Sequence, residues 1–257
     1  MRSFCRLALI LALLLTLGTA PAWAAVTCST TTDIVQTYTT TTALSTQFAA
    51  SVSAGSFGIY AISTTTNETA TVSVAPSDGT NTWTLLAGPI DHASTTLRTW
   101  YYYAENMGAG QHTVTATLSE AVSGRVVMAT CLGGTTTLRL DAYDTDAYQS
   151  ASSDTHGPTD AVTASAARDG VVFGIGLLNT STGVSSLADG NETNLTGVTD
   201  RGHVIVELIA ASGAHTIGAI TYASIGRGNY MTVIALEEAA GGSSACHGML
   251  LGVGCEY

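Results

Sequence analysis

The chain has 257 residues and no lysine, and its 8 arginines stand against 19 acidic residues, so the formal net charge is −11. A nucleic-acid-binding protein needs a basic surface that displaces phosphate counterions, and this charge balance argues against that class. Hydrophobic residues make up 46% of the chain and charged residues 11%, which excludes a disordered polyelectrolyte. Threonine supplies about one residue in six, and a chain rich in Thr, Val and Gly is typical of an all-β fold.

Residues 1–24 have the pattern of a cleaved secretory signal. Arg2 and Arg6 precede an apolar run over 7–17, and Ala22-Trp23-Ala24 ends in the small-x-small pattern that signal peptidase reads. The run is shorter than the roughly 20 residues that cross a bilayer. We therefore expect a bacterial protein that is secreted or held at the cell surface and has no membrane span.

Residues 25–46 are rich in threonine, and they permit two interpretations. The segment is either an extended, O-glycosylated lead-in or a first edge strand, because threonine suits a pleated surface.

Residues 47–238 contain short apolar runs separated by turn residues such as Asp78-Gly79 and Ser212-Gly213. This spacing predicts one large antiparallel β-sandwich, jelly-roll or immunoglobulin-like, of roughly a dozen strands. Two smaller sandwiches with a boundary inside 133–160 are the alternative. The expected strands cover 58–63, 69–75, 82–86, 97–104, 112–118, 125–132, 138–143, 161–166, 171–178, 203–209, 215–223 and 230–236.

Two of these runs carry local detail. In 112–118, Val114, Ala116 and Leu118 alternate with three threonines, which predicts a strand with one buried and one exposed face. The runs 161–166 and 171–175 flank Asp169-Gly170, and this arrangement predicts a hairpin.

The chain ends in a Gly/Ser linker over 239–245 and a short Cys-bounded tail over 246–257. Four cysteines follow the signal, and an even number in an exported chain suggests disulfides, with three possible pairings. We favour Cys246–Cys255, which leaves Cys28–Cys131 to attach the N-terminal segment to a strand. The alternative is that Cys131 is a small buried hydrophobic residue. The apolar side chains of the tail dock either on a neighbouring subunit or on their own domain.

Six stretches occur in an order that resembles a known group of proteins. They read NTWTLLAGP at 81–89, LRTWYYYAEN at 97–106, GQHTVTATL at 110–118, LDA at 140–142, DGVVFG at 169–174 and MTVIAL at 231–236. This order resembles the β-sandwich modules of secreted bacterial surface proteins and phage-tail-associated proteins, over residues 57–237. The resemblance implies a β-sandwich with an adhesive, structural or carbohydrate-contacting role, and it supplies no catalytic residue.

The run of Trp100, Tyr101, Tyr102 and Tyr103 is the candidate ligand site. In a strand, Trp100 and Tyr102 point to one face and the other two to the opposite face. We expect one pair in the core, while the other pair is either packed across strands or half exposed as a platform for sugar rings.

Asp141, Asp144 and Asp146 form the densest acidic cluster. On a loop, their oxygens could gather around Ca²⁺, which takes six to eight oxygen ligands. The alternative is that they are solvated carboxylates that keep a sheet from pairing with its neighbours. No other cofactor is indicated.

No nucleophile elbow, metalloprotease helix, phosphate-binding loop or dinucleotide fingerprint occurs in the sequence. We therefore expect a secreted, non-enzymatic structural or adhesive protein that assembles with copies of itself or with other surface proteins into a filament or surface layer. The alternative is a carbohydrate-binding module that uses the aromatic strand, with or without calcium, to bind polysaccharide.

Overall fold

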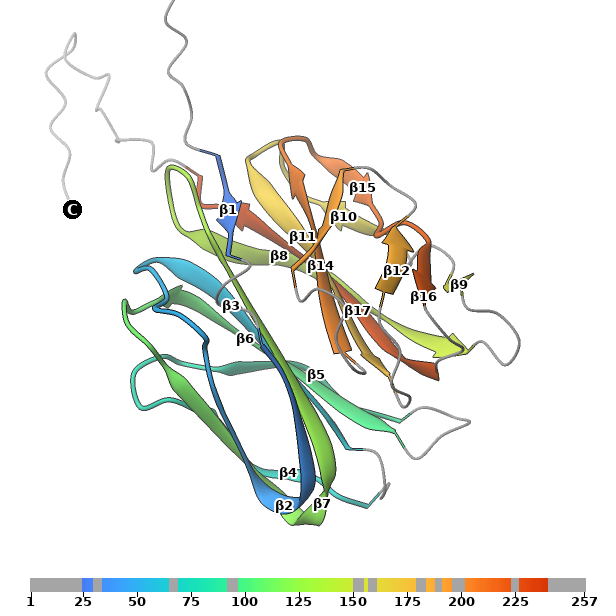
Figure 1. Cartoon of the computed structure of the whole chain (residues 1–257). Coiled ribbons are helices and arrows are strands. Elements are labelled where there is room, and N and C mark those ends of the chain that lie inside the picture. Colours follow the sequence, from blue (N-terminus) through green and yellow to red (C-terminus); the bar gives the residue numbers. More distant parts are fainter. Residues whose placement is uncertain are drawn as a thin grey trace, which may run out of the picture.

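The computed structural model describes residues 25–29, 34–64, 69–91, 97–149, 155–156, 161–178, 184–187, 191–195, 202–222 and 227–239. These residues form antiparallel strands and turns, with no helix among them, which confirms the all-β, sandwich-like prediction (Figure 1). None of the described residues belongs to a helix that is long and apolar enough to cross a bilayer. The expected signal and the Cys-bounded tail lie outside the described residues.

The strands divide into two halves of the chain. The N-terminal half contains β1 (Thr27–Cys28), β2 (Ile34–Gln47), β3 (Ser56–Thr64), β4 (Val72–Ser77), β5 (Thr84–Asp91), β6 (Arg98–Met107) and β7 (Thr113–Leu132). The C-terminal half contains β8 (Leu138–Gln149), β9 (Thr155–His156), β10 (Val162–Ala164), β11 (Gly170–Leu178), β12 (Val184–Leu187), β13 (Glu192–Asn194), β14 (Gly202–Ile209), β15 (Gly213–His215), β16 (Ile220–Tyr222) and β17 (Arg227–Glu237).

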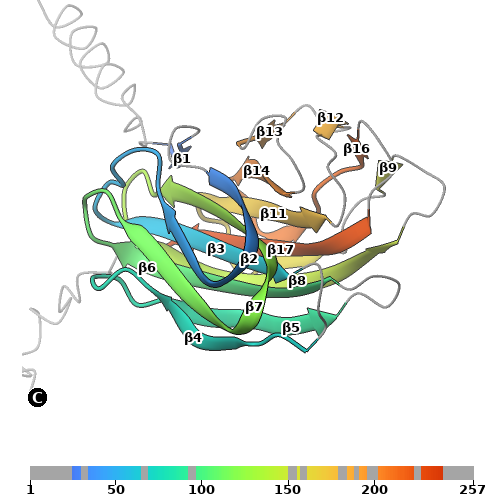
Figure 2. The same cartoon turned by 60° about the horizontal axis from the view of Figure 1, so that its bottom comes forward.

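Strand β7 organises the N-terminal half because it takes part in two layers. Its second part lies between β1 and β3 in a sheet of order β1-β7-β3-β6-β5, which we call the inner N sheet. Its first part pairs with the second part of β2 and with β4, and these three segments form the outer N layer. Figure 2 shows β2 and β7 running together from one layer into the other. The Thr-rich segment 34–47 is therefore an edge strand, since β2 pairs with β7.

The C-terminal half repeats this arrangement, with shorter strands in its outer layer. Its inner C sheet has the order β8-β17-β11-β14-β13. The pair β10-β15 and the sheet β12-β16-β9 lie over it and form the outer C layer.

Three apolar cores separate the four layers. One core fills the space between the outer N layer and the inner N sheet, a second joins the two inner sheets, and a third lies beneath the outer C layer. The inner sheets are thus covered on both faces. Strands β3 and β11 are buried at every residue, which explains their near-continuous apolar sequences.

The two halves are copies of one folding unit. The inner sheets have the same strand order when β3, β6 and β5 are matched with β11, β14 and β13, and β7 with β17. The matched strands share short motifs: FGI occurs at 57–59 and 173–175, GQHTV at 110–114 and GAHTI at 213–217, and GR at 124–125 and 226–227. Both glycines that open the longer motif have a positive φ, 133° at Gly110 and 129° at Gly213.

Equivalent residues of the two copies meet at the central core. Phe57 and Phe173 occupy the same place in the repeated motif, and their rings stack with centroids 5.7 Å apart and an interplanar angle of 28°. A residue contacts its own equivalent only close to a two-fold axis. The two halves therefore pack in the manner of a symmetric dimer whose subunits have been joined into one chain.

The expected hairpin over 161–175 is wrong. Strand β10 pairs with β15, and β11 pairs with β14 and β17. The turn at Asp169-Gly170 carries the chain from the outer C layer into the inner C sheet, so the two strands that flank it belong to different layers.

Candidate functional site: an uncharged hydroxyl face

The outer surface of the outer N layer is rich in hydroxyl groups and poor in charge: the charged side chain described on its three segments is Glu120, which accepts from the Thr69 hydroxyl at 2.6 Å. The alternation over 113–118 is confirmed, because Val114, Ala116 and Leu118 are at most 2% exposed while the three threonines between them are exposed or half-exposed. We call this surface the Thr face. Its members are Ser45, Gln47, Ser73, Val74, Thr113, Thr115 and Thr117.

Strand pairing and side-chain hydrogen bonds hold the Thr face together. Ser45 lies opposite Thr115 and Gln47 opposite Thr113, and the Thr115 hydroxyl donates to Ser45 Oγ at 2.9 Å. From the other side, the Ser73 hydroxyl donates to the carbonyl of Thr117 at 3.1 Å. Neighbouring strands are about 4.8 Å apart, and alternate residues of a strand about 6.7 Å. The result is a surface on which serine and threonine hydroxyls predominate, and those of Thr115 and Ser73 already donate within the chain.

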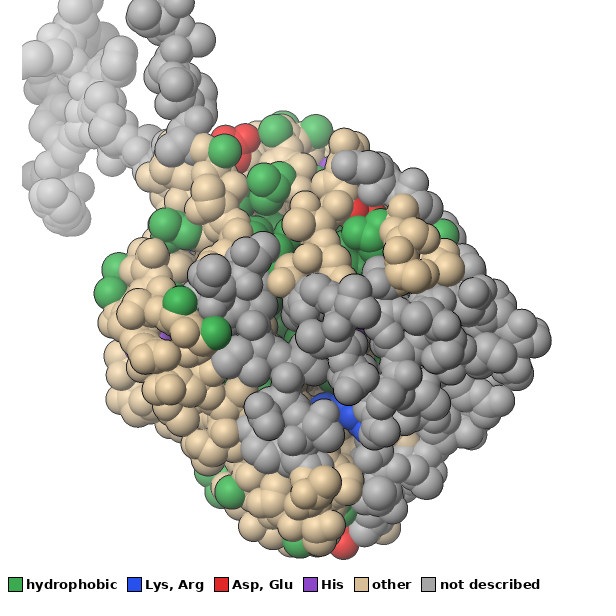
Figure 3. Space-filling view, viewed as in Figure 1, with side chains coloured by type: hydrophobic (Ala, Val, Ile, Leu, Met, Phe, Trp, Pro, Cys, Tyr) green, Lys and Arg blue, Asp and Glu red, His purple; other side chains and the backbone are tan. Residues whose placement is uncertain are grey.

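Charge is sparse on the described part of the face that Figure 3 shows. In the view of Figure 3, acidic and basic side chains occupy small areas among polar and backbone atoms. Several of the charged side chains pair with one another, as Arg98 does with Asp91 at 2.5 Å and Arg139 with Glu105 at 2.8 Å.

Of the two interpretations of the aromatic run, packing is correct and the exposed platform is not, because both faces of β6 are covered. Trp100 and Tyr102 are 3% and 4% exposed and belong to the core under the outer N layer. Tyr101 is fully buried in the central core, where its hydroxyl donates to the carbonyl of Asn229 at 3.2 Å. Tyr103 is half-buried and stacks on Phe57 with ring centroids 5.8 Å apart. These four side chains stabilise the packing of the layers.

The calcium cluster is not formed by the described side chains. The three aspartates lie on strand β8 instead of a loop. Asp141 occupies a bulge opposite β17, and its carboxylate accepts hydrogen bonds from the N–H, at 2.8 Å, and the hydroxyl of Ser165. Asp144 accepts from the N–H of Thr145 at 2.7 Å, and the side chain of Asp146 lies outside the description. Among the described residues there is no group of three or more metal-ligating side chains.

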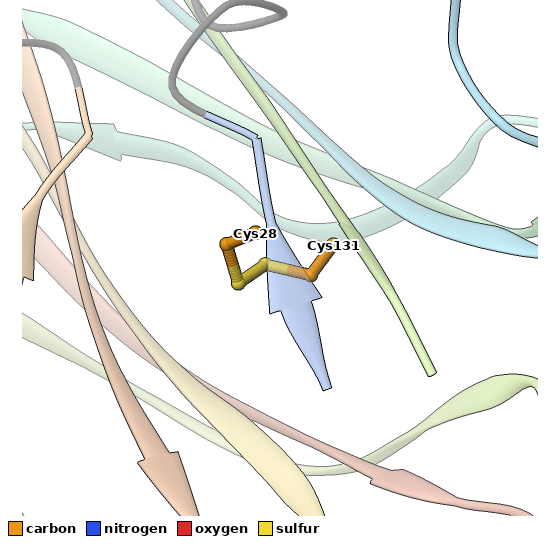
Figure 4. The surroundings of a disulfide bond; sticks show 2 residues. All are labelled: Cys28 and Cys131. Atoms are coloured by element: carbon orange, nitrogen blue, oxygen red, sulfur yellow. A yellow bond between two sulfur atoms is a disulfide. The ribbon is translucent and has the colours of Figure 1, made fainter. Parts of the chain in front are cut away.

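The predicted Cys28–Cys131 disulfide is present (Figure 4). The two residues face each other on β1 and β7, with Cα atoms 4.1 Å apart. The bond attaches the N-terminal segment to the edge of the inner N sheet. Cys246 and Cys255 lie outside the described residues.

A buried polar cluster around Asp78 escaped the sequence reasoning. The Asp78 carboxylate accepts from the N–H groups of Thr80 and Asn81 at 2.9 and 2.7 Å, and from the Asn81 side chain at 2.5 Å. His112 Nδ1 lies 3.4 Å from the same carboxylate, and its Nε2 donates to the carbonyl of Gly108 at 2.9 Å. His215 donates in the same way to the carbonyl of Ala211 at 3.2 Å. The repeated G-x-H motif was the available signal, and its role is to close a turn.

The Asp78 cluster makes the stability of the fold depend on pH. Burial raises the pKa of Asp78, but hydrogen bonds from Asn81 and Thr80 and the nearby His112 lower it, and the net pKa lies below the ordinary value of 3.8. A lowered pKa stabilises the fold above the unfolded-state pKa, and this contribution is lost as the pH falls through the folded-state pKa. We expect Asp78→Ala to cost about 1 to 3 kcal/mol at pH 7 and less below pH 4, as measured by urea unfolding at several pH values. An equal cost at pH 7 and pH 3 would contradict this role for the charge.

A pocket of about 510 Å³ lies where the two halves are connected and is lined by Thr135, Thr136, Ala167, Arg168, Asp169, Ala210, Glu237 and Glu238. The buried Glu237 carboxylate accepts from the N–H of Gly134 and from the N–H, at 2.8 Å, and hydroxyl of Thr135. Arg168 donates to the Glu237 carbonyl at 2.6 Å. These groups fasten the connecting segment to the end of β17.

The Thr face is therefore the candidate functional site, because its side chains are accessible, uncharged and regularly spaced. Comparison of the chain with family models, with curated proteins and with solved structures finds no match.

Proposed function

We propose that this chain is an exported, non-enzymatic structural or adhesive protein that associates with copies of itself through the Thr face. The observation that carries the proposal is an exposed, hydroxyl-rich sheet face whose seven members carry no charge, on a chain whose net charge is −11. Two acidic copies repel each other wherever carboxylates meet. Uncharged faces let them approach without that repulsion. The disulfide agrees with export, since such bonds persist in oxidising compartments.

The chemistry of the face suits reversible contact. Taking a hydroxyl from water costs far less than taking a charge when the hydroxyl finds a new partner, and serine and threonine hydroxyls can pair with one another across an interface. We therefore expect association that rises with protein concentration.

Light scattering of the mature chain over a range of concentrations tests the proposal. The wild type should grow in particle mass, and Thr115→Glu should remain monomeric because it places a carboxylate in the centre of the face. Thr193→Glu is the matched control, since Thr193 is an exposed threonine on β13, away from the Thr face, and it should associate like the wild type. Equal association of all three proteins would rule out the Thr face as the contact.

The same variants also test whether the partner is a polysaccharide. A monomeric wild type that is retained by an insoluble polysaccharide, with retention lost in Thr115→Glu, would replace self-association by carbohydrate binding on this face.

A further inference from the structure

The pocket where the two halves are connected has the size and the walls of a small-molecule site. Its volume of about 510 Å³ falls within the roughly 300 to 1,000 Å³ of ligand pockets, and such pockets occur preferentially where two folding units meet. Alanine side chains and threonine methyl groups supply apolar walls. Thr135 and Thr136 are held in place, because Thr135 donates to the Glu237 carboxylate and the Thr136 hydroxyl donates to the carbonyl of Glu238 at 3.1 Å.

Four charged side chains line the pocket, and two of them already have partners. Glu237 is 4% exposed, and its carboxylate accepts three hydrogen bonds from the connecting segment. The carboxylate of Glu238 lies 2.6 Å from the guanidinium of Arg139. Neither carboxylate needs a ligand to complete its contacts.

The other two charged side chains, Arg168 and Asp169, are half-buried and have no opposite charge beside them in the described part of the chain. Arg168 donates through Nη1 to the carbonyl of Glu237 at 2.6 Å, and a guanidinium has five N–H donors, so most of its donors remain for a ligand. Within the same described ranges, the Asp169 carboxylate accepts no hydrogen bond and forms no ion pair. The pocket therefore contains one unmatched charge of each sign.

The N-terminal copy indicates that the fold does not need these two charges. Counting back from the shared FGI motif, Val52 and Ser53 stand where the C-terminal half has Arg168 and Asp169. Val52 and Ser53 line a smaller pocket of about 130 Å³ ahead of β3, and β3 is buried at every residue as β11 is. The charge pair is thus an addition to one of two equivalent places in the duplicated unit.

We infer that this pocket binds a small zwitterion of the α-amino acid class, with the ligand carboxylate on Arg168 and the ligand ammonium group on Asp169. A guanidinium matches the geometry of a carboxylate. A ligand with a negative charge alone would be repelled by Asp169, Glu237 and Glu238, and one with a positive charge alone would be repelled by Arg168. The inference does not depend on self-association through the Thr face.

Isothermal titration calorimetry of the oxidised mature chain at pH 7 tests the inference with three probes. Phenylalanine carries both charges, 3-phenylpropanoate lacks the ammonium group and 2-phenylethylamine lacks the carboxylate. Each analogue forfeits one charge-assisted contact and leaves one charge of the pocket unmatched. Phenylalanine should therefore bind at least about tenfold more tightly than either analogue.

Two variants assign the two ends of the ligand. Arg168→Gln keeps a donor for the Glu237 carbonyl, and it should weaken phenylalanine about tenfold without weakening 2-phenylethylamine. Asp169→Asn should weaken phenylalanine to a similar extent without weakening 3-phenylpropanoate. Asp144→Asn is the matched control, because it removes an exposed carboxylate of β8 that does not line the pocket, and it should bind like the wild type. Circular dichroism verifies folding.

Three outcomes would overturn the inference. They are the absence of phenylalanine binding at about 10 mM, equal affinities for the three probes, and a loss in Asp144→Asn as large as that in Asp169→Asn. Light scattering of the same proteins tests the proposed function separately, so either can fail while the other holds.

Discussion

Replacing Cys28 and Cys131 together by serine should lower the free energy of unfolding by about 4 kcal/mol. The bond joins residues separated by 103 positions in the sequence, and closing so long a loop removes much of the conformational entropy of the unfolded chain. Urea unfolding of the double variant, compared with the oxidised wild type, measures the change.

Reduction is the control for that experiment. The wild type in excess dithiothreitol should unfold at the same urea concentration as the double variant. If the reduced and oxidised wild types unfolded together, the bond would not stabilise the fold.

Phe57→Ala should cost about 3 to 5 kcal/mol, because Phe57 is fully buried in the central core and alanine leaves a cavity there. Phe173→Ala should cost a similar amount. The stacked pair should show a coupling free energy of about 1 kcal/mol in a double-mutant cycle. Because this core is shared, both halves should unfold in one transition in the wild type and in all three variants.

Leu85→Ala is the matched control for the phenylalanine variants. Leu85 is 49% exposed, and its truncation should change stability by no more than about 0.5 kcal/mol. Two separate transitions in the wild type, or a cost of Phe57→Ala as small as that of Leu85→Ala, would contradict a shared central core.

The sequence predicted features that depend on local alternation. The residues 113–118 show it most clearly, because a strand places alternate side chains on opposite faces whatever its neighbours are. The same reasoning placed Trp100 and Tyr102 on one face of β6 and Tyr101 on the other. The Thr face could be predicted to this extent, as a row of outward threonines on one strand.

The errors arose where the outcome depends on strands distant in sequence. Alternation over 100–103 is compatible with an exposed platform and with a strand covered on both sides, and the inner C sheet decided between them. The turn at Asp169-Gly170 was recognised, but β10 pairs with β15 across about fifty residues instead of with β11. Asp141 was expected on a loop, but it lies in strand β8, at a bulge opposite β17.

The duplication could have been found from the sequence, although only a few residues repeat. The motifs FGI and G-x-H-T recur in both halves, and the matched strands β3 and β11 share burial at every residue. Burial tolerates many apolar side chains of similar volume, so two copies can keep one fold while their sequences diverge.

By itself, the sequence determined the all-β class, the exposed row of threonines over 113–117 and the pairing of Cys28 with Cys131 as one of three options. Only the tertiary structure decided that the halves stack through a shared core, that the aromatic strand is covered and that β2 and β4 flank the row of threonines on β7. The physical reason is that side chains alternate between the two faces of a strand, so the sequence shows which residues share a face. Which face is buried depends on strands that the chain brings together only after long connections.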